Sequence, residues 1–142
     1  MLRSGAVFSA IAVLTACSQV HPSRTVVPNN GDRIVITEEM IARSGGSNAW
    51  EVLKRTAPQL TYRDRREGQP TKLERRGNSS LVLNDSPMLF VDGVRLPDFR
   101  SLESIPAKTI ARIEILNGID GTTYYGTDAE AGVILISTKN GT

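Results

Sequence analysis

Few side chains in this sequence of 142 residues could carry out nucleophilic or acid–base chemistry near neutral pH: it has one cysteine, Cys17, and one histidine, His21. With no second cysteine, a disulfide within the chain is impossible, and one histidine cannot build a multi-histidine metal site. Asp and Glu are plentiful, but they lack the spacing of a metal-binding loop. The sequence therefore predicts no metal site and no cofactor, and it directs attention to Cys17.

The segment before Cys17 is typical of an export signal. Arg3 gives a positive start, and Ala6–Leu14 is an apolar run far shorter than the roughly twenty residues of a membrane-spanning helix. Leu14-Thr15-Ala16-Cys17 resembles the lipobox of bacterial lipoproteins, in which the cysteine is acylated and becomes the mature N-terminus. With Ser18 rather than Asp after the cysteine, the resemblance implies a lipid anchor in the outer membrane, with the domain on the periplasmic face or, if flipped, outside. The alternative is a buried cysteine on a core helix.

Residues 18–32 (SQVHPSRTVVPNNGD) are mostly polar and contain proline, asparagine and glycine, which favours a tether over a helix. His21 lies in this tether and Cys17 carries the lipid, so no nucleophile–base pair of the usual kind remains. We therefore expect a non-enzymatic protein. Its expected parts are a signal peptide (1–16), a tether (17–32) and one folded domain (33–142).

Residues 63–76 form a strongly charged stretch, with six positive and three negative side chains. Arg63, Arg65 and Arg66 are candidates for docking an acidic ligand, a lipid headgroup or the wall of a receptor barrel. The alternative is an ordinary solvated loop. A nucleic-acid partner is not expected, because the net charge is only +2 and an exported protein does not meet nucleic acid. The stretch also lacks interleaved aromatic residues on which bases could stack.

Tyr124 and Tyr125 lie between glycines and form a second binding candidate. An exposed pair of tyrosine rings would suit recognition of a partner, and we expect it to form one contact surface together with the basic stretch 63–76. The alternative is that one ring packs in the core.

Short apolar runs and amphipathic stretches must position these candidates. Strands are expected at 34–36, 81–83, 88–91, 94–96, 110–116 and 132–138. The last run, GVILIST, is apolar on both faces, so it should lie centrally in the sheet and be covered on both sides. With helices expected within 37–56 and a long exposed loop at 63–76, the fold class is α+β (α/β mixed), built on a small mixed sheet.

Local signals mark the ends of these elements. Thr37 should cap the first helix, which should stop at Gly45-Gly46, and the second helix should end at Ala57-Pro58. Asn48 and Glu51 have the spacing of a capping box. Three further expectations are Trp50 as a core anchor, a tight turn at Asp92-Gly93, and one helical turn at 101–105.

Five pieces of sequence follow one another in an order that resembles the plug domain of TonB-dependent outer-membrane receptors, over roughly residues 34–139. They are Arg76-Gly77; Leu89-Phe90-Val91-Asp92-Gly93-Val94; Pro106, Ile110 and Arg112-Ile113-Glu114-Ile115-Leu116 with Gly118; Tyr125-Gly126; and Gly132-Val133-Ile134-Leu135-Ile136-Ser137-Thr138-Lys139. On the residues alone, Arg112 and Glu114 share one face of a strand and can pair with each other or with neighbours.

The resemblance also implies partners. In the family, the arginine that matches Arg76 pairs with carboxylates of the barrel wall, so Arg76 joins the binding candidates. A complete receptor needs a transmembrane barrel after the plug, and this sequence stops three residues after Lys139. We therefore expect a stand-alone plug-like module that binds a ligand, a separately encoded barrel or a periplasmic transport protein. The alternatives are a structural envelope module and a degenerate receptor remnant.

Overall fold

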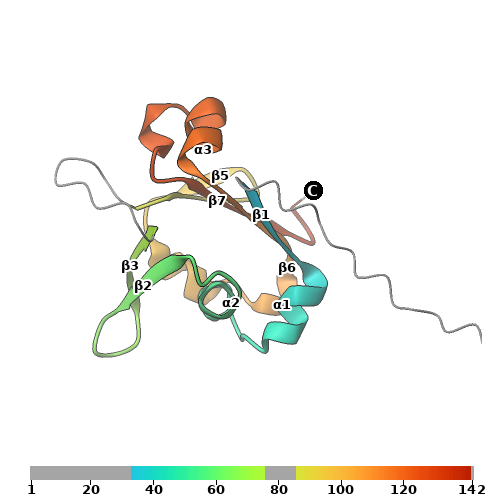
Figure 1. Cartoon of the computed structure of the whole chain (residues 1–142). Helices are drawn as coiled ribbons and strands as arrows, with labels where there is room; N and C mark the ends of the chain where they lie inside the picture. The colour runs from blue at the N-terminus through green and yellow to red at the C-terminus, as the bar shows by residue number, and fades with distance from the viewer. Residues whose placement is uncertain (1–32, 76–85, 142) are drawn as a thin grey trace, which may run out of the picture.

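The computed structural model describes residues 33–75 and 86–141, and its order of elements alternates short strands and helices (Figure 1). The elements are β1 (Arg33–Thr37), α1 (Glu38–Ser44), α2 (Ala49–Thr56), β2 (Leu60–Asp64), β3 (Pro70–Arg75), β4 (Met88–Val91), β5 (Val94–Leu96), the 3₁₀ helices η1 (Phe99–Ser104) and η2 (Ala107–Thr109), β6 (Ile110–Leu116), α3 (Gly118–Tyr125), the 3₁₀ helix η3 (Thr127–Ala129) and β7 (Val133–Thr138). The mixture confirms the α+β prediction.

Five strands form one mixed sheet in the order β1-β6-β7-β4-β5. The β4–β7 pair is parallel, and the other three pairs are antiparallel. The predicted neighbourhood of 88–91, 110–116 and 132–138 is therefore confirmed, with β7 between β6 and β4.

The central strand β7 has an apolar neighbour layer on each face, as its sequence predicted. Ile134 and Ile136 join the larger core cluster, which includes buried residues of α1 and α2. Val133 belongs to a second, smaller cluster with Ala129 of η3, and Leu135 packs against that cluster. Figure 1 shows the consequence: α1 and α2 lie on one side of the sheet and α3 on the other.

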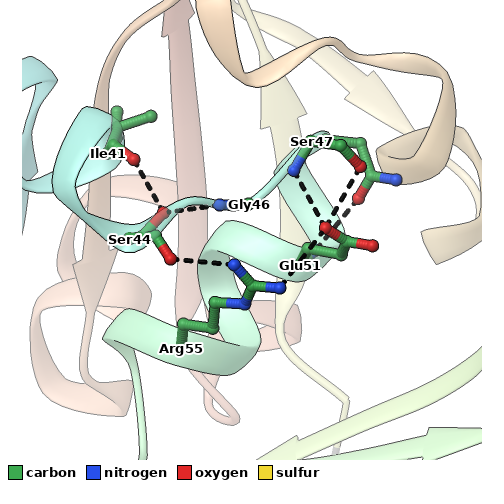
Figure 2. Close-up of polar contacts among 7 residues, drawn as sticks. Ile41, Ser44, Gly46, Ser47, Glu51 and Arg55 are labelled. Atoms are coloured by element: carbon green, nitrogen blue, oxygen red, sulfur yellow. Dashed lines mark hydrogen bonds and ion pairs between the residues drawn. The ribbon is translucent and has the colours of Figure 1, made fainter.

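The corner between α1 and α2 is held by a polar network (Figure 2). Gly45 ends α1 with a φ of 66°, a left-handed conformation that favours glycine. Asn48 caps α2 by accepting the backbone N–H of Glu51 at 3.0 Å. The Glu51 carboxylate accepts the N–H and hydroxyl of Ser47, the residue before the cap, at 2.9 and 3.1 Å. Arg55 closes the network by donating to the backbone oxygen of Ser44 at 2.9 Å.

Other local expectations have mixed outcomes. Thr37 does precede α1, but its side chain makes no capping hydrogen bond. Asp92 and Gly93 have φ angles of 47° and 79°, as a primed hairpin turn between β4 and β5 requires. The helical turn expected at 101–105 is η1, which Asp98 caps. The strand expected at 81–83 lies outside the described residues.

The long exposed loop expected at 63–76 is wrong, because most of this segment belongs to the antiparallel hairpin β2–β3. Leu60 and Leu73 are buried and point into the larger core cluster, with exposed fractions of 3% and 0%. Each strand has only one such leucine, and Leu73 lies between Lys72 and Glu74, so the alternation that predicts a strand is too weak to see in the sequence.

Ile134→Asp should destabilise the fold severely. Ile134 has no exposed surface, so the substitution buries an unpaired carboxylate at a cost of several kcal/mol, against a typical domain stability of about 5–15 kcal/mol. Urea unfolding followed by circular dichroism measures the loss. Val94→Asp, at a strand residue that is 63% exposed, is the matched control and should unfold almost like the wild type. Equal stabilities for the two variants would contradict the central place of β7.

The Glu51 network should make stability depend on pH. The N–H of Ser47, its hydroxyl and nearby positive charges together hold the pKa of Glu51 below its usual value of 4.5. A lowered folded-state pKa stabilises the protein above the unfolded-state value, and this contribution is lost as the pH falls below it. The difference in urea midpoint between wild type and Glu51→Gln should therefore shrink from pH 7 to pH 3. Glu103→Gln, at an exposed residue, is the control and should show no such trend.

Candidate functional site

The hairpin β2–β3 carries the basic candidates, and its strands are attached to helix α2. The Tyr62 hydroxyl lies 2.7 Å from the backbone oxygen of Leu53 and 2.9 Å from that of Ala57, so it can donate to either. Burial raises the pKa of Tyr62 far above its usual value, which keeps this donor protonated. The hydroxyl therefore ties β2 to the C-terminal turn of α2.

A second attachment joins the end of β2 to α2 through Asp64. One carboxylate oxygen accepts the Trp50 indole N–H at 3.0 Å, and the other accepts the Lys54 ammonium at 2.6 Å. Trp50 also meets Tyr62 edge to face, with 5.2 Å between the ring centroids, and is buried as the sequence predicted. Because β2 is fixed to the helix at two points, the turn that follows it extends from a rigid base.

The charges on the hairpin divide into paired and unpaired groups. Glu74 pairs with Arg63 at 3.3 Å and with Lys72, and its hydrogen bond with Lys72 is the main cause of its lowered pKa. Arg65 and Arg66, in the turn between the strands, are exposed and have no ion pair among the described residues. The backbone of Arg65 nevertheless closes the turn, through hydrogen bonds with Gln69 and Gly68. Among the hairpin side chains that the structure describes, these two guanidinium groups are the free positive charges.

The tyrosine candidates lie on α3, away from the hairpin. Tyr125 packs on Phe90 of β4 with 4.9 Å between ring centroids, whereas Tyr124 is 72% exposed. Helix α3 covers the face of the sheet that carries Val133, while the hairpin leucines belong to the cluster on the opposite face. The structure therefore does not bring the arginine and tyrosine candidates into one surface, although the sequence reasoning had joined them (Figure 1).

A third charged group, which sequence reasoning found only in part, lies on the same face of the sheet as α3. Glu114 is almost fully buried, with 4% of its side chain exposed, and it pairs with two half-exposed arginines. Arg112 lies 2.7 Å from one carboxylate oxygen, and Arg33 of β1 contacts the other. The Arg112–Glu114 pairing was expected from their spacing, but Arg33 lies far away in sequence and only the β1–β6 register brings it close. Two arginines around one carboxylate leave a net positive charge here.

A small hollow in the described part of the chain can be compared with ligand pockets. Its volume is about 120 Å³, and it lies beside β5, lined by residues that include Arg95, Asp98, Phe99 and Asp128. Pockets for drug-sized ligands typically have roughly 300–1,000 Å³. The exposed side chains are therefore better binding candidates than this hollow.

The described residues also bear on metals and membranes. They contain no group of three His, Cys, Asp or Glu side chains that could hold a metal ion. None of the helices in 33–75 and 86–141 combines the length and the apolar character needed to cross a membrane. Cys17 and Arg76, the lipidation candidate and a binding candidate, both lie outside the described residues.

Comparisons with known proteins agree with the fold. A family model described as the TonB-dependent Receptor Plug Domain matches residues 28–133. TonB-dependent receptor P26 of Formosa agariphila is 30% identical over 84 residues, which are 59% of this chain and 8% of that protein. TonB-dependent receptor SusC of Bacteroides thetaiotaomicron is 25% identical over 119 residues, or 78% of this chain and 12% of that protein. The chain thus spans a small part of these relatives.

Solved structures give the same result. The RagAB peptide importer in its open-open state matches with a TM-score of 0.59 at 22% identity, over 77% of this chain and 12% of that one. The siderophore receptor PirA from Pseudomonas aeruginosa matches with a TM-score of 0.53 at 25% identity, over 77% of this chain and 18% of that one. Together with the family model, which covers most of the sequence, these likenesses show that the chain belongs to the family of TonB-dependent receptor plug domains.

Proposed function

We propose that this plug domain is a non-enzymatic binding module of outer-membrane transport, held at the periplasmic face of the outer membrane by a lipid on Cys17. Its relatives carry names as different as peptide importer and siderophore receptor, so the plug fold by itself does not specify a cargo. The partner must therefore be sought from the surface of this chain. Its expected class is an acidic face of a receptor barrel or of a periplasmic transport protein.

The observation that carries the proposal is the pair of unpaired arginines at the hairpin turn. Arg65 and Arg66 are exposed, whereas the carboxylates of Asp64 and Glu74 are already engaged by Lys54, Arg63 and Lys72. Free guanidinium groups can bind carboxylates in two-point contacts. An acidic partner would thus gain interactions here without breaking any ion pair of the domain.

The attachment of the hairpin supports the same proposal. Binding residues commonly lie on loops that a rigid scaffold positions. Here the scaffold is α2, which holds β2 through Tyr62 and Asp64. Little conformational freedom remains to be lost in the base of the hairpin on binding, which favours affinity. Arg63 is a weaker candidate than Arg65 and Arg66, because it already pairs with Glu74.

Charge reversal at the turn tests this surface. The double variant Arg65→Glu/Arg66→Glu should capture at least about tenfold less partner in a cross-linking pull-down from membranes at low salt. Its thermal stability should stay nearly unchanged, because exposed charges contribute little to folding. The loss should diminish at high salt, where screening shortens the reach of the charges.

The matched control is Arg100→Glu/Lys108→Glu, which reverses two exposed charges on η1 and η2 instead. It should capture the same partner as the wild type. Equal capture by the hairpin variant and this control would remove the hairpin from the proposal and favour a structural envelope module. Arg76→Glu can be compared in the same assay, since the family resemblance makes Arg76 a separate candidate.

Anchoring has its own test. Each buried CH₂ of an acyl chain contributes about 0.8 kcal/mol, so a protein with several chains remains on the membrane. Cys17→Ser should abolish the lipid mass and leave an unacylated form that either moves to the aqueous phase of a detergent partition or keeps its uncleaved signal peptide. Cys17→Ala is the matched second variant and should behave alike. A wild-type protein without lipid mass in the aqueous phase would contradict the anchor.

A further inference from the structure

Strand β1 forms one edge of the five-stranded sheet. Within residues 33–75 and 86–141 it pairs with β6 alone, in a regular antiparallel register over all five of its residues. An edge strand presents unpaired N–H and C=O groups, which are a template for another strand. Proteins usually protect such edges with charge, proline, a bulge or short length.

The other strand edges of the described residues carry such protection, whereas β1 carries one charge only, on Arg33 at its first residue. At the opposite edge of the sheet, β5 has three residues and an exposed Arg95 at its centre. The hairpin β2–β3 has a register irregularity at Arg63/Asp64 and several charged side chains. The centre of β1, from Ile34 to Ile36, contains three β-branched apolar residues with no charge, proline or bulge.

The hydrogen bonds and registers of the sheet show which residue of β1 offers its backbone at this edge. Asp92 donates its N–H to the oxygen of Ile136, so the backbone groups of Ile136 face β4 and those of Leu135 face β6. Leu135 pairs with Glu114, so the next residue of β6, Ile113, faces β1, and its partner Ile36 directs its N–H and C=O to β6. Backbone groups of successive residues in an antiparallel strand point in opposite directions, so those of Val35 face away from β6. Val35 is also only half-buried.

We propose that β1 pairs antiparallel with β1 of a second copy of this chain, around a two-fold axis at Val35. This register places Val35 opposite the partner's Val35, Ile34 opposite the partner's Ile36, and Arg33 opposite the partner's Thr37. Apolar residues therefore meet apolar residues, and no like charges lie directly opposite one another, an arrangement that favours cross-strand pairing. The result is one continuous sheet through two domains.

A second copy fits this edge better than an unrelated strand because the sequence of β1 is self-complementary. A two-fold axis requires the same patch on both subunits, which the run Arg33–Thr37 satisfies at every position. The one charge in the strand, on Arg33, stays paired with Glu114 of its own chain. Association of two copies therefore leaves no arginine without its carboxylate partner. This inference goes beyond the proposed function and does not rest on it.

A charge exchange at Val35 tests the register. In full chains that carry Cys17→Ser, the wild-type strand should give a concentration-dependent dimer by sedimentation. Val35→Lys or Val35→Glu alone places like charges opposite each other and should weaken self-association at least about tenfold. An equal mixture of the two variants should restore dimers. Val94→Lys, on the other edge strand, is the matched control and should dimerise like the wild type.

Cross-linking is an independent test of the same register. It still decides the question when circular dichroism shows that a charged variant does not fold. In the Cys17→Ser chain, Val35→Cys is the only thiol, and a short thiol-reactive linker should join two copies through it. Glu130→Cys, at an exposed residue beside α3, should give no such product. The proposal would be overturned by a wild type that stays monomeric at high concentration or by a dimer that survives Val35→Lys. Equal cross-linking of the Val35→Cys and Glu130→Cys variants would also overturn it.

Discussion

The burial of β7 on both faces is the constraint on which the rest of the domain depends. A strand with apolar side chains in both directions needs a layer on each side, and neither layer can form from the sheet alone. The larger layer comes from α1, α2 and the hairpin leucines, and the smaller one from α3 and η3. The sheet therefore determines where the binding candidates on the hairpin and on α3 lie on the surface of the domain.

The smaller layer is held close to the sheet by glycines. A Cβ on Gly121 of α3 would come within 2.6 Å of the backbone oxygen of Ala129, and one on Gly132 within 2.5 Å of that of Leu116. Gly132 also has a φ of 101°, which other residues rarely adopt. These contacts explain, without any ligand, why the segment between β6 and β7 has glycine at 121 and 132. They set α3 on the sheet and leave Tyr124 on its outer side.

Sequence reasoning succeeded where one short-range signal dominates. The two-sided apolar run predicted the central strand, Gly45 predicted the end of α1, and Asp92-Gly93 predicted the hairpin turn. It failed for β2–β3, whose strand character comes from docking Leu60 and Leu73 onto a helix rather than from their own pattern. It also missed Arg33 beside Glu114, because no pattern within one segment shows which strand will pair with β6.

The candidate sites share one fold but occupy separate layers, and this separation has an energetic consequence. The hairpin that carries Arg65 and Arg66 is attached to α2 through Asp64, Tyr124 is exposed on α3 at the opposite face of the sheet, and Val35 lies in the edge strand β1. Substitutions at distant sites without shared partners usually have additive effects, while residues in one network do not. Contacts at the hairpin and at β1 should then be nearly independent, since Asp64 and Glu114 belong to different charge networks. One plug domain can in this way hold a partner through its hairpin while its sheet edge stays available.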